Sequence, residues 1–332
     1  MSQKLIVITG PTAAGKTGLG IRLAQILSGE VVSADSMQIY RGMDVGTAKP
    51  TLGERMGVPH HMIDVADPHE SYSVARYVAE ASACVDDILA QGKTPIVVGG
   101  TGLYIESLLL GRGFAEQGVQ HPQGADVQDA QETGGLTPPL RVELLERYDR
   151  LGGEVLWREL REIDPLAAER LHPNDKKRIV RAIEVFRLTG QTITAHNEAT
   201  RALPVRYEAV KLAITATDRA DLYRRIDSRV DAMLEQGLVG EVTRLLESGL
   251  SPGSTAMQAI GYKEMAEVIL GEVSLETAVE RVKQESRRYA KRQLSWIRRD
   301  SDCHWIFWDG EPDPEKTLHV STEFCRRAGI MI

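Results

Sequence analysis

The residues best suited to chemistry lie together near the start of the chain. Residues 10–17 read Gly-Pro-Thr-Ala-Ala-Gly-Lys-Thr and follow the apolar run at 5–8. The spacing G-x-x-x-x-G-K-[ST] lets backbone N–H groups surround phosphate oxygens, while the lysine adds a positive charge and the threonine hydroxyl can hold Mg²⁺. The stretch predicts a phosphorylated small-molecule ligand, without identifying it, bound by Gly10, Pro11, Thr12, Ala13, Ala14, Gly15, Lys16 and Thr17.

A carboxylate is expected beside this loop. Asp35 follows the apolar pair Val31 and Val32, 18 residues after Thr17. Ligands of parallel sheets bind beyond the carboxyl ends of the strands, so Asp35 should face the phosphate site. On these residues alone it is equally a helix cap, an indirect Mg²⁺ ligand or a catalytic group. The following loop, residues 35–50, mixes polar, aromatic and glycine residues, and its length favours substrate handling.

The elements that must position these residues alternate between strands and helices. We predict strands at 5–8, 30–33 and 94–98, a helix at 16–27 and another helix after residues 99–102. This order predicts a parallel sheet with crossover helices. The turns at 10–17, 35–38 and 99–102 should then surround one crevice.

The second half of the chain predicts an insertion. Residues 111–139 are rich in Gly, Gln, Asp and Pro and lack apolar periodicity, which predicts a mobile surface segment. Helical spacing follows at 140–161 and 175–188, a strand at 210–215, helices from 218 to 296 and a last strand at 303–308. The predicted class is α/β, a P-loop NTPase-like parallel sheet with crossover helices and an inserted helical subdomain: a catalytic body of residues 1–112 and 203–332, and an insertion of residues 113–202.

Composition excludes several classes of protein. The chain has 332 residues and a net charge of −7, and it contains no apolar run long enough for a signal peptide or a membrane span. Its three cysteines, Cys84, Cys303 and Cys325, are widely separated, which argues against a disulfide framework or a zinc site. We expect a cytoplasmic monomer that does not contact a membrane.

Two basic segments lie on this acidic chain. Residues 281–299 contain eight Lys or Arg against one Glu, a net charge of +7, and residues 174–190 contain five against two, a net charge of +3. Such runs are usually solvated helix faces, but RNA phosphates would use the same charges.

Nine stretches, in order over nearly the whole chain, resemble the bacterial tRNA dimethylallyltransferases, also called tRNA isopentenyltransferases. They include the phosphate loop, DSMQIYRGMDVGTAKPT at 35–51, GGTGLY at 99–104, NDKKRIVRAIEVF at 174–186, RIDSRVDAMLEQGL at 225–238 and YAKRQLSWIRR at 289–299. The resemblance implies transfer of the dimethylallyl group of dimethylallyl diphosphate to N6 of the tRNA adenosine just 3′ of the anticodon, with release of diphosphate and with Mg²⁺ as the cofactor.

The resemblance also implies roles for single residues. Asp35 is similar in position to the family's general base, which accepts the proton of the adenine amine. Arg229 matches the arginine that stabilises the leaving diphosphate, and Thr101 looks like the residue lining the channel where donor and adenine meet. Without the resemblance, Arg229 reads as a surface ion-pair residue and Thr101 as a helix N-cap. His60 and His61 match positions near the donor site and receive no catalytic role.

The resemblance also implies that Thr17 holds Mg²⁺. The tRNA surface that it implies has three parts. This chain has Lys177 where the family usually has Gln. The difference could replace a contact with an RNA base by a contact with the RNA backbone. The residues expected to contact tRNA are Asp35, Ser36, Met37, Gln38 and Thr101 at the target base; Arg141, Lys177, Arg178, Ile179, Val180 and Arg181 on the insertion; and Gln258, Gly261, Tyr262, Lys263, Lys291 and Arg292 near the C-terminal basic segment.

Three other functions compete with this one. An adenylate isopentenyltransferase would use a free nucleotide, but it would leave the two basic segments without a purpose. A P-loop small-molecule kinase explains residues 10–17 equally well and predicts consumption of ATP. A non-catalytic RNA-binding protein leaves Asp35 and its loop unexplained.

Overall fold

A computed structural model of the chain describes residues 4–111, 139–202 and 204–330. The contacts divide the chain into two compact units, residues 1–70, 76–111 and 206–332 in the first and residues 71–75 and 112–205 in the second. The segment predicted to be mobile lies almost entirely outside the described residues.

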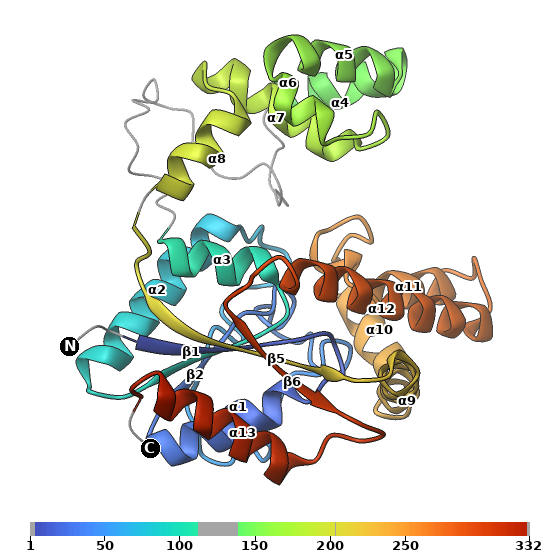
Figure 1. The fold of residues 1–332 in the computed structure, drawn as a ribbon. Coiled ribbons are helices and arrows are strands. Elements are labelled where there is room, and N and C mark those ends of the chain that lie inside the picture. The colour runs from blue at the N-terminus through green and yellow to red at the C-terminus, as the bar shows by residue number, and fades with distance from the viewer. Residues whose placement is uncertain (1–3, 112–138, 203, 331–332) are drawn as a thin grey trace. The chain divides into compact units, whose positions relative to one another are not determined.

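The first unit is built on a six-stranded parallel sheet in the order β3-β2-β4-β1-β5-β6 (Figure 1). Strands buried on both faces read as continuous apolar runs, which is why most of them could be predicted. Of these strands only β3 was not predicted, because it has two residues and no apolar run. The strands are β1 (Lys4–Thr9), β2 (Glu30–Ser33), β3 (His60–His61), β4 (Pro95–Val98), β5 (Glu208–Ala216) and β6 (Cys303–Trp308).

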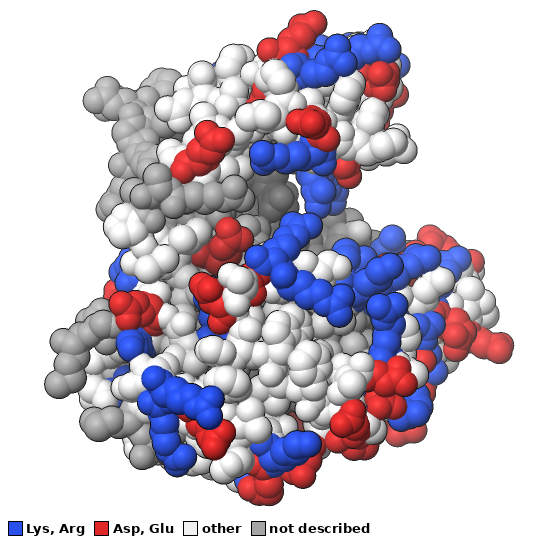
Figure 2. Space-filling model, viewed as in Figure 1, with Lys and Arg blue, Asp and Glu red and all other residues white. Residues whose placement is uncertain are grey.

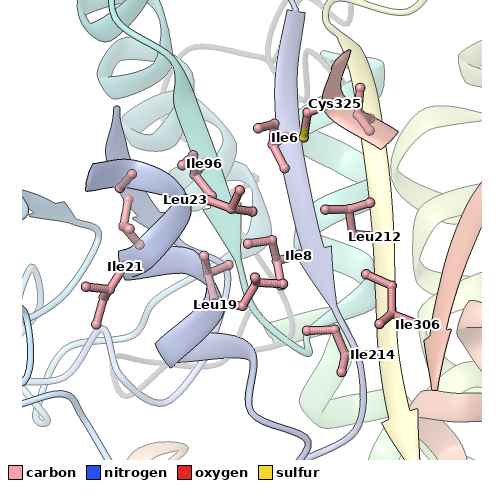
Figure 3. Close-up of a cluster of buried hydrophobic side chains, with 14 of the residues drawn as sticks. Ile6, Ile8, Leu19, Ile21, Leu23, Ile96, Leu212, Ile214, Ile306 and Cys325 are labelled. Carbon is pink, nitrogen blue, oxygen red and sulfur yellow. The ribbon is translucent and has the colours of Figure 1, made fainter. Parts of the chain in front are cut away.

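Helices cover both faces of this sheet. In Figure 1, α1 (Lys16–Leu27) and α13 (Pro314–Arg327) lie on one face, and α2 (Val74–Ala90) and α3 (Gly102–Leu110) lie on the other. Leu19 and Leu23 of α1 point toward Ile8 and Ile96 in the core (Figure 3). The remaining helices follow β5, namely α9 (Arg219–Glu235), α10 (Leu238–Glu247), the short η1 (Ala256–Gln258), α11 (Tyr262–Ile269) and α12 (Leu275–Ile297).

The second unit is helical within its described residues. The helix predicted over 140–161 is in fact two helices, because Gly152 has a φ of 85°, a left-handed value that ends the first helix. Leu144, Leu156 and Ile183 lie in the core of this unit. Its helices are α4 (Pro139–Leu151), α5 (Gly153–Ile163), α6 (Pro165–Glu169), α7 (Lys176–Thr189) and α8 (Ile193–Ala202).

Candidate active site

The phosphate-binding loop connects β1 to α1 and depends on its glycines. A Cβ atom at Gly10 would lie 2.3 Å from the carbonyl oxygen of Ile214, so no larger residue fits there. Gly15, the N-cap of α1, has a φ of 94°. No side chain caps this helix, and its first N–H groups therefore stay available for an anion.

A cavity of about 340 Å³ opens beside the loop. Its lining includes Lys16, Asp35, Gly99 and Arg229, so the three turns predicted to surround one crevice do surround it. The cavity lies where the carboxyl ends of β1, β2 and β4 meet the helix α9. The phosphate loop and the candidate base are thus brought together by the sheet.

Two cations of this cavity that are not exposed, Lys16 and Arg229, lack a carboxylate ion pair within the described residues. Burial and the nearby Arg229 lower the pKa of Lys16 to about 8, although Asp35 acts in the opposite direction. Burial also lowers the pKa of Arg229, whose Nε atom has no hydrogen-bond partner. The ion pair considered for Arg229 is therefore absent from the described part of the chain. Lys16 Nζ donates a hydrogen bond to the Pro11 carbonyl at 2.7 Å. Such a pair of cations suits an anionic ligand.

Asp35 stands in a tight turn that Thr101 supports. An Asp35 carboxylate oxygen accepts the N–H of Met37 at 2.9 Å, and the N–H of Ser36 donates to Thr101 Oγ1 at 3.1 Å. Thr101 occupies the N-cap position of α3 as predicted, but its side chain makes no capping bond. Its hydroxyl instead links the ends of β2 and β4.

The loop at 35–50 is fixed by two buried charged residues that the sequence analysis missed. Glu241 on α10 accepts the N–H groups of residues 44, 45 and 46 at 3.0, 2.8 and 3.2 Å. Lys49 donates to the Tyr40 carbonyl at 2.8 Å and pairs with Asp44 and Asp64. The loop is long but firmly anchored.

The basic segment on α12 divides into two parts. Arg281, Lys283, Arg287 and Arg288 each pair with a neighbouring carboxylate. Within the described residues Lys291, Arg292, Arg298 and Arg299 form no ion pair, and all four are exposed. Figure 2 shows Lys and Arg side chains gathered over this region of the surface. Unneutralised charge is therefore concentrated at the C-terminal end of the helix.

Three of the residues expected to contact tRNA have buried side chains. Ile179 and Val180 lie in the core of the second unit, and Tyr262 is fully buried and donates to Glu241. Their contact with tRNA stays a prediction, and it would have to be made by backbone atoms, because the three side chains are packed inside the protein. Among the other expected residues, Lys177, Arg178, Gln258 and Lys263 are exposed. Whether they contact tRNA stays a prediction.

Arg141 also has a structural task. It forms an ion pair with the fully buried Glu184 at 2.6 Å, and Arg181 binds the same carboxylate oxygen at 3.0 Å. These arginines neutralise a buried charge, which would be costly if left alone.

The residues present fit Mg²⁺ carried with a phosphorylated ligand. The exposed Thr17 hydroxyl and the Asp35 carboxylate line the same cavity, and both are the hard oxygen donors that Mg²⁺ prefers. The described residues contain no cluster of three metal-binding side chains, and Mg²⁺ held through phosphates does not require one. In the same residues no helix has the length and apolar character needed to cross a membrane.

Comparisons with known proteins agree with this site. The family model described as IPP transferase matches residues 38–300, and the one described as Isopentenyl transferase matches residues 3–64. The tRNA dimethylallyltransferase of Acetivibrio thermocellus is 44% identical over 99% of this chain and 100% of its own. The tRNA dimethylallyltransferase 2 of Geotalea uraniireducens is 45% identical over 91% and 92%, respectively.

Solved structures give the same result. The tRNA isopentenylpyrophosphate transferase of Bacillus halodurans has a TM-score of 0.68 and 38% identity, covering 99% of this chain and 97% of that one. A eukaryotic dimethylallyltransferase acting on tRNA has a TM-score of 0.77 and 31% identity, covering 98% and 80%. The P-loop NTPase-like fold is confirmed by these neighbours. From its sequence relatives, its fold and its site, the chain belongs to the tRNA dimethylallyltransferase family.

Proposed function

We propose that this protein transfers the dimethylallyl group of dimethylallyl diphosphate to N6 of the adenosine just 3′ of the anticodon in tRNA. The observation that carries the proposal is the shared cavity of Lys16, Arg229 and Asp35. Two cations beside a phosphate loop suit a diphosphate, and a carboxylate in the same cavity suits the amine that displaces the diphosphate. A kinase would explain the loop but not the supported turn at Asp35.

The leaving group gains negative charge as the allylic C–O bond breaks. Lys16, Arg229 and the first N–H groups of α1 are placed to stabilise that charge. Mg²⁺, when bound by the Thr17 hydroxyl and the diphosphate oxygens, would neutralise more of it. The cation pair lowers the barrier most if its attraction for diphosphate grows as the bond lengthens.

The adenine amine is a weak nucleophile and must lose a proton as the C–N bond forms. Asp35 is the carboxylate in the cavity that can accept it, an effect worth about 10² to 10⁴ in rate. The target adenosine has to leave its stack to reach Asp35. The bond from Ser36 to Thr101 keeps the turn ready for that approach.

The rest of the tRNA would be held by charge. Lys291, Arg292, Arg298 and Arg299 offer cations without carboxylate partners in the described chain, suited to RNA phosphates. We also propose that the protein is a monomer and that it acts in the cytoplasm, where its tRNA substrate is found.

The deciding experiment supplies labelled dimethylallyl diphosphate and Mg²⁺ together with either unmodified tRNA or AMP. We expect label in the tRNA, on N6 of the adenosine after the anticodon, with one diphosphate released per transfer and no use of ATP. Label in AMP alone would instead establish the adenylate enzyme. Phosphate transfer from ATP to a small acceptor would establish the kinase.

A substitution then tests the base. Asp35→Asn keeps the shape and one acceptor oxygen but removes the basic carboxylate, so turnover should fall by about 10² or more while tRNA affinity changes little. The exposed Asp309→Asn serves as the matched control. Normal turnover of the Asp35 variant would remove this residue from the mechanism.

A further inference from the structure

We propose that Gln293 is a positioning residue that locks the phosphate-binding loop to the turn carrying Thr101, and thereby sets the distance between the diphosphate donor and Asp35. The proposal rests on the proposed function and adds a residue on α12 to the apparatus for that reaction.

The Gln293 amide uses both of its ends. Its Oε1 atom accepts the N–H of Thr12 at 2.9 Å, and its Nε2 atom donates to the carbonyl of Gly100 at 3.1 Å. The side chain is 7% exposed. Thr12 belongs to the loop after β1, and Gly100 to the turn after β4, next to Thr101. One buried amide thus fixes the spacing of two loops that face the cavity.

Close packing leaves the helix little freedom to move away. A Cβ atom at Gly100 would lie 2.1 Å from Gln293 Nε2, and one at Gly102 would lie 2.3 Å from the Trp296 ring. Both glycines of this turn are therefore needed for α12 to come so near. This packing gives a physical reason for the glycines at 100 and 102.

Tyr289 lies one helical turn before Gln293 and lines the same cavity. Burial raises the pKa of Tyr289 to about 12, so the hydroxyl stays neutral under ordinary conditions. Thr101 in turn accepts the N–H of Ser36, beside the candidate base. Hydrogen bonds thus connect the phosphate loop through Gln293 to Gly100, and the next residue, Thr101, to the Asp35 turn.

The test compares three variants in the full-length protein. Gln293→Met keeps the length of the side chain but loses both hydrogen bonds. Gln293→Glu loses the donor to Gly100 when ionised, yet its protonated carboxyl group both accepts and donates as the amide does. Gln284→Met, at an exposed site on the same helix, is the matched control.

We expect Gln293→Met to lower kcat by about 10², because misplacing the donor by about 1 Å can cost that much, with KM for tRNA changed less than about threefold. The ratio of kcat of Gln293→Glu to that of the wild type should rise as the pH falls, since protonation restores both bonds. A merely structural side chain would not give this pH-dependent rescue. Full activity of Gln293→Met would overturn the proposal. If Gln293→Met does not fold, a kcat ratio of Gln293→Glu to the wild type that stays constant with pH would overturn it instead.

Binding of inorganic diphosphate gives a readout that does not depend on turnover. Calorimetry should show about fivefold weaker binding by Gln293→Met than by Gln284→Met, because the N–H of Thr12 loses its partner. Equal binding by these two variants would also count against Gln293. If the wild type fails to modify tRNA but the difference in diphosphate binding persists, then the proposed function fails while the role of Gln293 in the loop stands.

Discussion

Tyr262 donates its hydroxyl hydrogen to Glu241 at an Oη–Oε1 distance of 2.5 Å, and the two residues together hold the loop that starts at Asp35. The same carboxylate accepts three successive backbone N–H groups of that loop. Gly46 comes so near to Tyr262 that a Cβ atom there would lie 2.4 Å from the ring. Burial and Glu241 both raise the pKa of Tyr262, so its hydroxyl remains a donor.

Glu241→Gln should destabilise the protein and weaken its use of tRNA. The introduced amide NH₂ would face N–H groups that need an acceptor, leaving at least one unsatisfied, at a cost of about 1–3 kcal/mol. Gln38 depends on the same loop, because its Nε2 atom donates to the Thr47 carbonyl at 3.2 Å. Urea unfolding should show the loss of stability, and KM for tRNA should rise. The exposed Glu247→Gln is the control on the same helix, and equal stability of the two variants would contradict this anchoring role.

Donor affinity should fall as the pH rises through about 8. Lys16 has a pKa near 8 in the ligand-free protein, so the ammonium that attracts diphosphate is lost over the range from pH 7 to pH 9. Calorimetry with inorganic diphosphate across that range checks this. Lys16→Met should lack the step, whereas titration of the diphosphate itself affects both proteins. Identical pH profiles would mean that Lys16 does not titrate there.

The same pKa makes a statement about stability. The folded protein binds the Lys16 proton less tightly than the unfolded chain, whose lysine titrates near 10.5. Between about pH 8 and 10.5 the unfolded chain therefore holds more protons, and the contribution of Lys16 to stability rises with pH. Subtracting the unfolding free energy of Lys16→Met at each pH isolates this contribution. A flat or falling difference would contradict the lowered pKa.

Arg229 and Arg225 stand one turn apart on α9 and should respond differently to substitution. Arg229 is an unpaired cation within the described chain, so Arg229→Met should leave the Tm unchanged or higher while lowering turnover by about 10² to 10³. Arg225 donates to the Ala13 carbonyl at 3.1 Å, pairs with Glu311 and lies over the Trp308 ring. Arg225→Met should therefore lower the Tm. An equal loss of Tm in both variants would make Arg229 a structural residue.

Much of the fold was predictable because its signals are local. The apolar runs of β1, β2 and β4, together with the glycine-rich turns after β1 and β4, predicted a parallel sheet and its crevice. The helices α2 and α13 were not predicted, although Asp313 and Pro314 form a typical helix start, in which the Asp313 carboxylate accepts the N–H groups of residues 315 and 316. The break at Gly152 was missed because a glycine within a helical pattern does not by itself reveal its φ.

The site was predictable only where a residue type suggests its own chemistry. Lys16, Asp35 and Arg229 could be named before their common cavity was known. Glu241 and Gln293 could not, because the backbone atoms that they bind belong to residues more than 190 positions away in the chain. A backbone N–H or carbonyl leaves no mark in the sequence. Such supporting contacts appear only when the fold brings the two segments together.

The two parts of the basic segment on α12 should contribute unequally to tRNA binding. Lys291 and Arg292 have no carboxylate partner in the described chain, whereas Arg281 pairs with Glu267 at 2.7 Å and Arg288 with Glu285 at 2.5 Å. The double variant Lys291→Gln/Arg292→Gln should therefore bind tRNA more weakly and reduce the slope of log K against log salt by about 0.7–0.9 for each tRNA phosphate that the protein no longer neutralises.

The matched control for this measurement is Arg281→Gln/Arg288→Gln, which removes the same formal charge from the same helix. It should lower tRNA affinity less, because its arginines are already neutralised, and KM for dimethylallyl diphosphate should stay close to the wild-type value in both double variants. If the two variants lose tRNA affinity equally, net charge alone governs binding. The absence of carboxylate partners near Lys291 and Arg292 in the described chain then has no effect on tRNA affinity. If donor KM rises while tRNA affinity is kept, these residues serve the cavity, which Arg292 itself lines, rather than the RNA.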